Sequence, residues 1–99
     1  MILLIGHIDI DPAAADGFGE TIVRQVEASR AEDGCISYAL SFDPTTPGRI
    51  NVAELWRDQA ALDAHRVADH MNVWRGRLAE IGGAARHIDQ YEVDPATRG

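Results

Sequence analysis

A carboxylate and a tryptophan two residues apart are the chain's clearest chemical signal. Glu54 and Trp56 lie in the run 49–57, whose alternation predicts a strand, and they share one face with Ile50 and Val52. A carboxylate on an apolar face needs a partner when it is buried. Glu54 is therefore either a base or proton relay with a raised pKa, or a structural anchor bonded to a neighbouring polar group. Trp56 is either the flat wall of a pocket for an aromatic ligand or an ordinary core residue.

Two histidines follow this strand. His65 continues the inward stripe of a short helix expected over 58–67, and we predict that it points toward Glu54. A His–Glu pair beside a pocket would shuttle protons, although a purely structural role fits His65 equally well. His70 opens a second helical segment, where capping or packing against Trp74 is the favoured interpretation and substrate contact the alternative. A spacing of five residues does not place His65 and His70 on one helical face, so no two-histidine metal site is expected.

Three further side chains are candidates for substrate contact. Tyr38 lies on the large-residue face of a strand expected over 35–43, where its phenol could bind a substrate oxygen. Arg86, on the last predicted strand, could hold an oxygen anion or form a structural salt bridge. Trp74 fits the core better than a binding role, but it belongs to the same candidate set.

The elements that must position these residues follow a simple order. Apolar periodicity and turn signals predict strands over 1–10, 35–43, 49–57 and 84–93, and helices over 12–31, 58–67 and 69–81. The order β-α-β-β-α-β, with the last helix in two pieces, is typical of the ferredoxin-like α+β fold with a four-stranded antiparallel sheet. We expect one domain over 1–93 and a polar tail over 94–99 that frays.

Composition narrows the classes of partner. The chain has 99 residues with 16 acidic side chains and nine cationic ones, all arginine, for a net charge of −7. Scattered cations on an acidic chain disfavour nucleic-acid binding. No apolar run approaches the roughly 20 residues of a membrane span, and Met1–Ile5 lacks the features of a signal peptide. The single Cys35 excludes an intramolecular disulfide and a multi-cysteine zinc site, so we expect a cytoplasmic protein.

The second face of the predicted sheet is also apolar. It carries Leu3, Ile5, Ala53 and Leu55, and both helices of a ferredoxin-like fold lie on the other face. An uncovered apolar face promotes aggregation of a monomer. We therefore expect a homodimer that buries the two sheet faces against each other.

Three motifs in order resemble one family. Asp33–Leu40 is similar to a G-C-x-x-Y-x-L element, Glu54–Asp58 to an E-x-W-x-(D/S) strand end, and Ala61–His65 with Asp69-His70 to an A-L-x-x-H…x-H segment. Together they resemble the antibiotic biosynthesis monooxygenase (ABM) family. The resemblance implies a dimeric α+β barrel with a pocket between the sheet and the helices of each subunit. Some members of this family oxidise quinols and polyketide phenols without metal, flavin or haem.

The resemblance implies three competing functions. The first is a cofactor-independent monooxygenase acting on a small aromatic or quinol substrate, with Trp56 as wall, Glu54 or His65 as base, and Arg86 or Tyr38 stabilising the anion. The second is a small-molecule isomerase, and the third a non-catalytic ligand-binding module. Haem-degrading members carry an Asn on the first strand where this chain has Gly6 and His7. We expect no metal, haem or flavin, given the histidine spacing and the absence of a glycine-rich phosphate loop.

Overall fold

Four strands form one antiparallel sheet in the order β2-β3-β1-β4. The computed structural model describes residues 1–97 and 99. Along the chain the elements are β1 (Ile2–Asp9), the 3₁₀ helix η1 (Pro12–Gly17), α1 (Gly19–Arg30), β2 (Cys35–Phe42), β3 (Arg49–Trp56), α2 (Gln59–Arg66), α3 (Asp69–Glu80) and β4 (Ala85–Glu92). This arrangement is the ferredoxin-like α+β fold that the sequence predicted.

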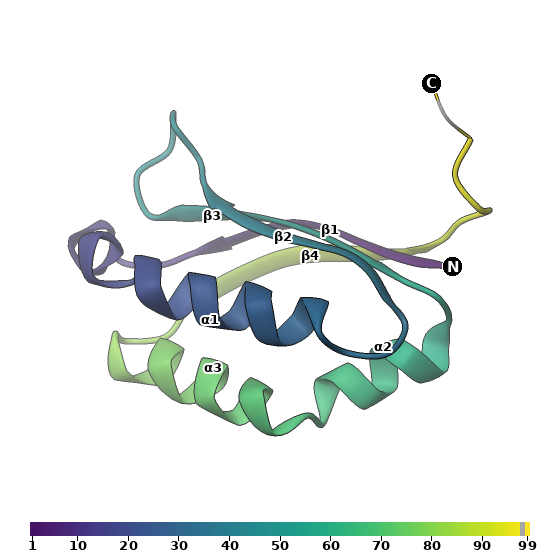
Figure 1. Ribbon diagram of the computed structural model, residues 1–99. Coiled ribbons are helices and arrows are strands. Elements are labelled where there is room, and N and C mark those ends of the chain that lie inside the picture. Colours follow the sequence, from purple (N-terminus) through teal and green to yellow (C-terminus); the bar gives the residue numbers. More distant parts are fainter. Residues whose placement is uncertain (98) are drawn as a thin grey trace.

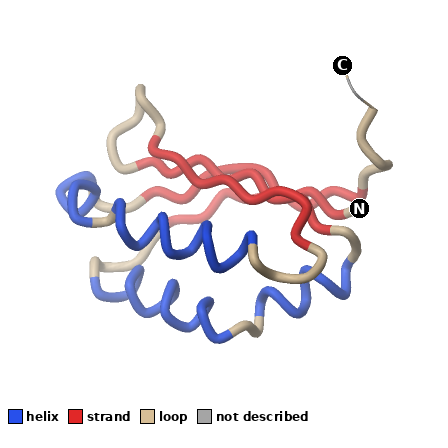
Figure 2. Tube along the Cα trace, viewed as in Figure 1, coloured by secondary structure: helices blue, strands red, loops and turns tan. Residues whose placement is uncertain are grey.

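Helices α1, α2 and α3 all cover the same face of the sheet (Figures 1 and 2). Each strand turns alternate side chains toward them, because successive side chains of a strand point to opposite faces. The buried strand residues are therefore spaced by two, and they meet apolar residues from the helices and the segment before α1. This core contains Ile2, Leu4, Ile8, Tyr38, Ile50, Val52 and Trp56 from the strands, and Phe18, Ile22, Leu62 and Trp74 from the helical layer.

The other face of the sheet has no helix over it in the described residues (Figure 1). Leu3 sits opposite both Leu55 on β3 and Tyr91 on β4. Ile5 and Tyr91 are 47% and 48% exposed, which is high for large apolar side chains. The apolar second face predicted from the sequence is thus present and open in the single chain.

The first helix differs from the sequence prediction. Instead of one helix over 12–31, η1 precedes α1 and Phe18 lies at the junction. Gly17 and Gly19 flank that junction, and each glycine disfavours a continuous helix by about 1 kcal/mol relative to alanine. Phe18 is almost fully buried, with its ring centroid 5.6 Å from that of Trp74. Phe18 therefore packs into the core from the break between η1 and α1, and not from the apolar face of one continuous helix.

β2 also departs from strict alternation. A bulge between Cys35 and Ser37 interrupts its pairing with β3. The extra residue of a bulge is left unpaired, and Ile36 is accordingly 48% exposed instead of lying on the buried large-residue face. Tyr38, after the bulge, keeps the inward orientation that the sequence predicted.

The amino terminus lies beside the residue that follows β4. The amino group of Met1 donates to the carbonyl of Val93 at 3.0 Å. Residues 94–97 of the predicted tail have no regular secondary structure, and Arg98 lies outside the described residues. Within residues 1–97 and 99, every helix is too short or too polar to cross a bilayer.

Candidate active site

Glu54 and Trp56 lie on the inward face of β3, as the alternation of that strand predicted. The indole Nε1 of Trp56 donates a hydrogen bond to Glu54 Oε1 at 3.0 Å. Glu54 is 7% exposed, and this burial raises the pKa of its carboxyl, while the Trp56 N–H and His65 act in the opposite direction. Glu54 is therefore both anchored in the core and readier to hold a proton than an exposed glutamate.

Helix α2 brings His65 against this pair. The helix is capped by Asp58, whose carboxylate accepts from the backbone N–H of Ala61 at 2.9 Å. His65 is 3% exposed, and its ring centroid lies 4.5 Å from that of Trp56. Its Nε2 is 3.9 Å from Glu54 Oε1. His65 thus faces Glu54 as predicted, at a separation that a small shift closes for proton transfer.

Tyr38 completes this buried group from β2. Its ring centroid is 5.6 Å from that of His65, and its Oη accepts a hydrogen bond from Gln25 Nε2 at 3.0 Å. Burial, together with the Glu54 charge, raises the pKa of the phenol well above its usual range. Tyr38 is therefore a neutral phenol whose own O–H remains available to a ligand oxygen.

A cavity of about 230 Å³ opens between the sheet and helices α2 and α3. Five of the residues proposed from the sequence line it, namely Tyr38, Glu54, His65, Trp74 and Arg86. Apolar side chains from the strands and from both helices supply most of the remaining wall, including Leu4, Leu40, Leu62, Met71 and Ile88. Trp56 lies behind Glu54 and His65 rather than at the cavity surface, so its contact with the cavity is indirect.

Three guanidinium groups gather at this cavity. Arg66 from α2, Arg75 from α3 and Arg86 from β4 all line it. Arg66 Nη2 donates to Gln90 Oε1 at 3.2 Å, and Arg75 Nη2 donates to the Arg66 carbonyl at 2.7 Å. Sequence analysis missed Arg66 and Arg75, because they lie on different helices whose relative orientation no periodicity reveals. The cavity is locally cationic although the chain carries a net charge of −7.

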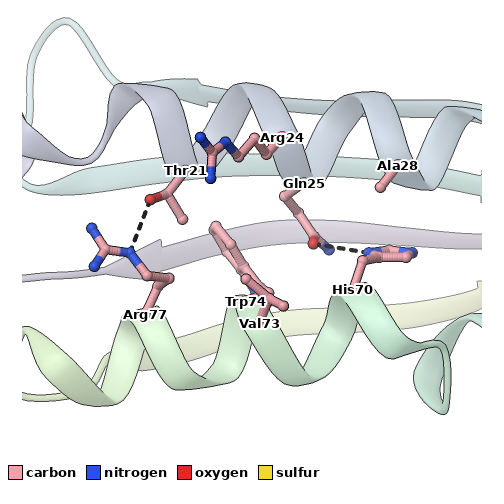
Figure 3. A pocket seen from close by; sticks show the side chains of 8 residues that line it. All are labelled: Thr21, Arg24, Gln25, Ala28, His70, Val73, Trp74 and Arg77. Carbon is pink, nitrogen blue, oxygen red and sulfur yellow. Dashed lines mark hydrogen bonds between the residues drawn. The ribbon is translucent and has the colours of Figure 1, made fainter.

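A second cavity, of about 240 Å³, lies between α1 and α3 (Figure 3). Trp74 and Val73 form its apolar wall, and Arg77 Nε donates to Thr21 Oγ1 at 3.3 Å at one end of it. It shares Trp74 with the first cavity but contains neither Glu54 nor His65. The cavity over the sheet is the candidate active site, because buried titratable groups converge there.

His70 does not lie at the candidate active site. It does not cap a helix, and it lines the cavity between α1 and α3 together with Trp74 rather than the cavity over the sheet. Its Nδ1 lies 3.2 Å from Gln25 Oε1, and its Nε2 contacts Glu32 Oε1. Sequence analysis missed Glu32, which sits in the turn before β2 directly ahead of the quoted Asp33–Leu40 element. It follows no apolar periodicity, so only the three-dimensional structure brings it to the histidines.

The model of the family described as antibiotic biosynthesis monooxygenase matches residues 1–77. The chain belongs to this family. An uncharacterized protein of Synechocystis is 38% identical over 92 residues, which are 93% of this chain and 63% of that protein, so the chain spans less than two thirds of this relative. A Mycobacterium tuberculosis protein named a "putative monooxygenase" is 31% identical over 70 residues, covering 71% of this chain and 68% of that protein.

A solved structure of a Deinococcus radiodurans protein shares the fold. Its TM-score is 0.86 at 24% sequence identity, with 99% of this chain and 97% of that chain covered. The residues matched by the ABM family model include Glu54, Trp56, His65 and His70, whereas Arg86 lies beyond them. Membership of the ABM family therefore agrees with the fold, while the chemistry depends on the residues that line the cavity.

Proposed function

We propose that this ABM protein is a cofactor-independent monooxygenase that oxidises a small phenol or quinol with O₂ in the cavity over the sheet. The observation that carries the proposal is the convergence on one apolar cavity of a buried acid–base pair, Glu54 and His65, with a neutral phenol and three arginines. A reaction that begins by deprotonating a phenol needs a base and a stabiliser for the resulting oxyanion. The family's monooxygenase name supports the same reaction class.

The cavity limits the substrate by size and charge. Its volume of about 230 Å³ is below the roughly 300–1,000 Å³ of pockets for drug-sized ligands, which favours one or two fused rings. Trp74, Leu40 and Ile88 give flat and apolar contacts. The arginines favour a substrate that is anionic or becomes anionic in the reaction. A phenolate or quinol anion meets all three conditions.

The proposed reaction needs only the substrate and O₂. Glu54 or His65 removes the phenolic proton, and Arg86 and the Tyr38 O–H stabilise the oxyanion. The anion passes one electron to O₂, and the resulting radical pair combines to form a C–O bond. Loss of water then leaves a quinone, so one oxygen atom enters the product and the other leaves as water. No external reductant is required, because the substrate supplies all the electrons.

We further propose that two copies pair through the open sheet face. Leu3 and Leu55 lie opposite each other on that face, and Ile5 beside them is 47% exposed. Burial of such residues against a second copy would remove an apolar surface from water at roughly 25 cal/mol per Å². The cavity lies on the opposite side of the sheet, so pairing leaves it accessible.

Oxygen uptake tests the proposed reaction. The purified protein is assayed in an oxygen electrode with one- and two-ring phenols and quinols, and we expect protein-dependent, saturable consumption of one O₂ per product. Arg86→Gln should raise KM, whereas Arg24→Gln, in the cavity between the helices, is the matched control and should not. Conversion of a substrate without O₂ consumption would indicate an isomerase instead. Binding without conversion would indicate a ligand-binding module.

A further inference from the structure

Three side chains of metal-ligating type meet beside the candidate active-site cavity, and one of them, His65, also lines that cavity. They are Glu32 from the turn between α1 and β2, His65 near the end of α2 and His70 in the first turn of α3. Glu32 Oε1 lies 2.9 Å from His65 Nδ1 and also contacts His70 Nε2. The three donor atoms all lie within 4.8 Å of one another.

A break between two helices brings the histidines together. α2 ends at Arg66 and α3 begins at Asp69, so the five-residue spacing does not run along one continuous helix. The sequence argument considered only a single helical face, so it did not foresee that the break lets both rings reach one carboxylate. The ring centroids of His65 and His70 are 5.6 Å apart.

Close packing of the α1–β2 turn places Glu32 beside them. Gly34 in this turn has φ +84°, and a Cβ added there would lie 2.5 Å from the Ala61 Cβ on α2. Only glycine allows the turn to adopt this conformation and to approach α2 so closely. The carboxylate of Glu32 is therefore held next to the helix that carries His65.

The hydrogen bond that His70 donates to Gln25 selects the ligating tautomer of His70 (Figure 3). Gln25 donates its amide N–H to Tyr38 Oη, which leaves its Oε1 to accept from His70 Nδ1–H. In a neutral ring, Nε2 then carries the lone pair, and it faces the acceptor oxygen of Glu32. Two lone pairs in contact require a proton or a cation between them. A second hydrogen bond that orients the ring is also the usual support of a metal-bound histidine.

One donor pair already has nearly the spacing of two ligands on a first-row divalent ion, whereas His70 Nε2 would have to move away from Glu32 Oε1 to make room for the ion. Metal–ligand bonds of about 2.0–2.2 Å place neighbouring ligand atoms roughly 3.0–3.4 Å apart. His65 Nδ1 and Glu32 Oε1, at 2.9 Å, need to move by only tenths of an ångström to reach that separation. Two imidazoles and one carboxylate form a ligand set that zinc and other first-row metals share.

We propose that Glu32, His65 and His70 form a binding site for a divalent first-row metal ion, with Zn²⁺ as its representative. The ion would join the α1–β2 turn to both helices at the α2–α3 break. The ion would be bound by Nδ1 of His65, while Nε2 of the same ring would still face Glu54 in the cavity. The site thus goes beyond the proposed oxygen chemistry, which needs no metal.

Calorimetric titration with Zn²⁺ and the absorption spectrum with Co²⁺ test this site on chelator-treated, folded protein. We expect one equivalent of Zn²⁺ per chain, a Co²⁺ ligand-field spectrum, and a higher melting temperature in Zn²⁺. Glu32→Gln and His70→Asn should each weaken binding at least about tenfold and abolish the melting shift. His70 is partly exposed, so its variant serves as the second test if Glu32→Gln folds poorly.

His87→Asn is the matched control. His87 stacks on His7 on the open sheet face, with the ring centroids 5.3 Å apart. This second pair of histidines is the place where a metal ion would bind adventitiously. The variant should bind Zn²⁺ as the wild type does. Absence of stoichiometric binding, loss of binding in His87→Asn, or unchanged binding in both site variants would each overturn the proposal. These measurements do not depend on turnover. A failure of the metal proposal is therefore distinguishable from a failure of the proposed monooxygenase activity.

Discussion

Glu54→Gln removes the charge of the cavity carboxylate while it keeps the shape of the side chain and one acceptor oxygen. We expect oxygen uptake per folded molecule to fall about 10²-fold or more, the usual effect of losing a general base. A 10²-fold loss corresponds to a barrier increase of about 2.7 kcal/mol. The expectation holds whether Glu54 takes the substrate proton itself or receives it from His65, because the two groups lie 3.9 Å apart and act as a pair.

The same variant should remain folded. An amide oxygen at this position can still accept from Trp56 Nε1, which now lies 3.0 Å from Glu54 Oε1. Exchanging a hydrogen bond to a charged group for one to a neutral group costs about 1 kcal/mol. Removing a buried carboxylate from a site that is 7% exposed lowers the desolvation cost of folding, and this gain offsets the cost of the weaker hydrogen bond. The free energy of unfolding at pH 7 should therefore change by no more than about 1 kcal/mol.

The pH dependence of stability gives an independent check. Burial raises the folded-state pKa of Glu54 above the 4.5 of an exposed glutamate, so unfolding releases a proton between these two values. The stabilising contribution of Glu54 is present below the unfolded pKa and is lost as pH rises through the folded pKa. The stability of the wild type relative to Glu54→Gln should therefore decrease as pH rises through this window.

Glu92→Gln is the matched control, since it removes the same charge from an exposed residue of β4. Both variants are compared by oxygen uptake and by thermal unfolding followed by circular dichroism. A folded Glu54→Gln protein that consumes oxygen within about threefold of the wild-type rate would refute the catalytic role. A large loss of stability with normal uptake per folded molecule would assign Glu54 to the structure alone.

Three further changes test other parts of the account. Leu55→Arg, on the open sheet face, should convert a dimer to a monomer in sedimentation, whereas Val23→Arg on the solvent side of α1 should not; an unchanged dimer would contradict the proposed pairing. Trp56→Phe removes the N–H bonded to Glu54 and should lower the free energy of unfolding by about 1–3 kcal/mol in a denaturant titration, where no change would argue against that bond. Asp58→Ala should lower the melting temperature by a few degrees through loss of the α2 cap, whereas Asp58→Asn should not; equal melting of both would argue against capping.

Local patterns were sufficient to predict the inward face of β3 and the orientation of His65. Alternation along a strand fixes which side chains share a face, so Glu54 and Trp56 were assigned correctly to the buried side. The helix stripe through Leu62 likewise predicted that His65 would turn toward the sheet. Both predictions rest on contacts within one element or between adjacent elements.

Contacts between distant elements could not be predicted from these patterns. Glu32 reaches His65 and His70 from a turn that no periodicity describes, and Arg66 and Arg75 converge only because α2 and α3 meet at an angle. The break at Phe18 and the bulge at Ile36 are places where packing competes with regular backbone geometry. A hydrophobic repeat of period two or 3.6 predicts only regular strands and helices, so it does not predict such interruptions.

Turnover under isotopically labelled O₂ tests the central claim most directly. The protein is incubated with the phenol or quinol that gives the fastest oxygen uptake, and the product is analysed by mass spectrometry. The proposed reaction predicts one labelled oxygen atom in the quinone product and one in water, with no added metal, flavin or reductant. A quinone product without the label would contradict it.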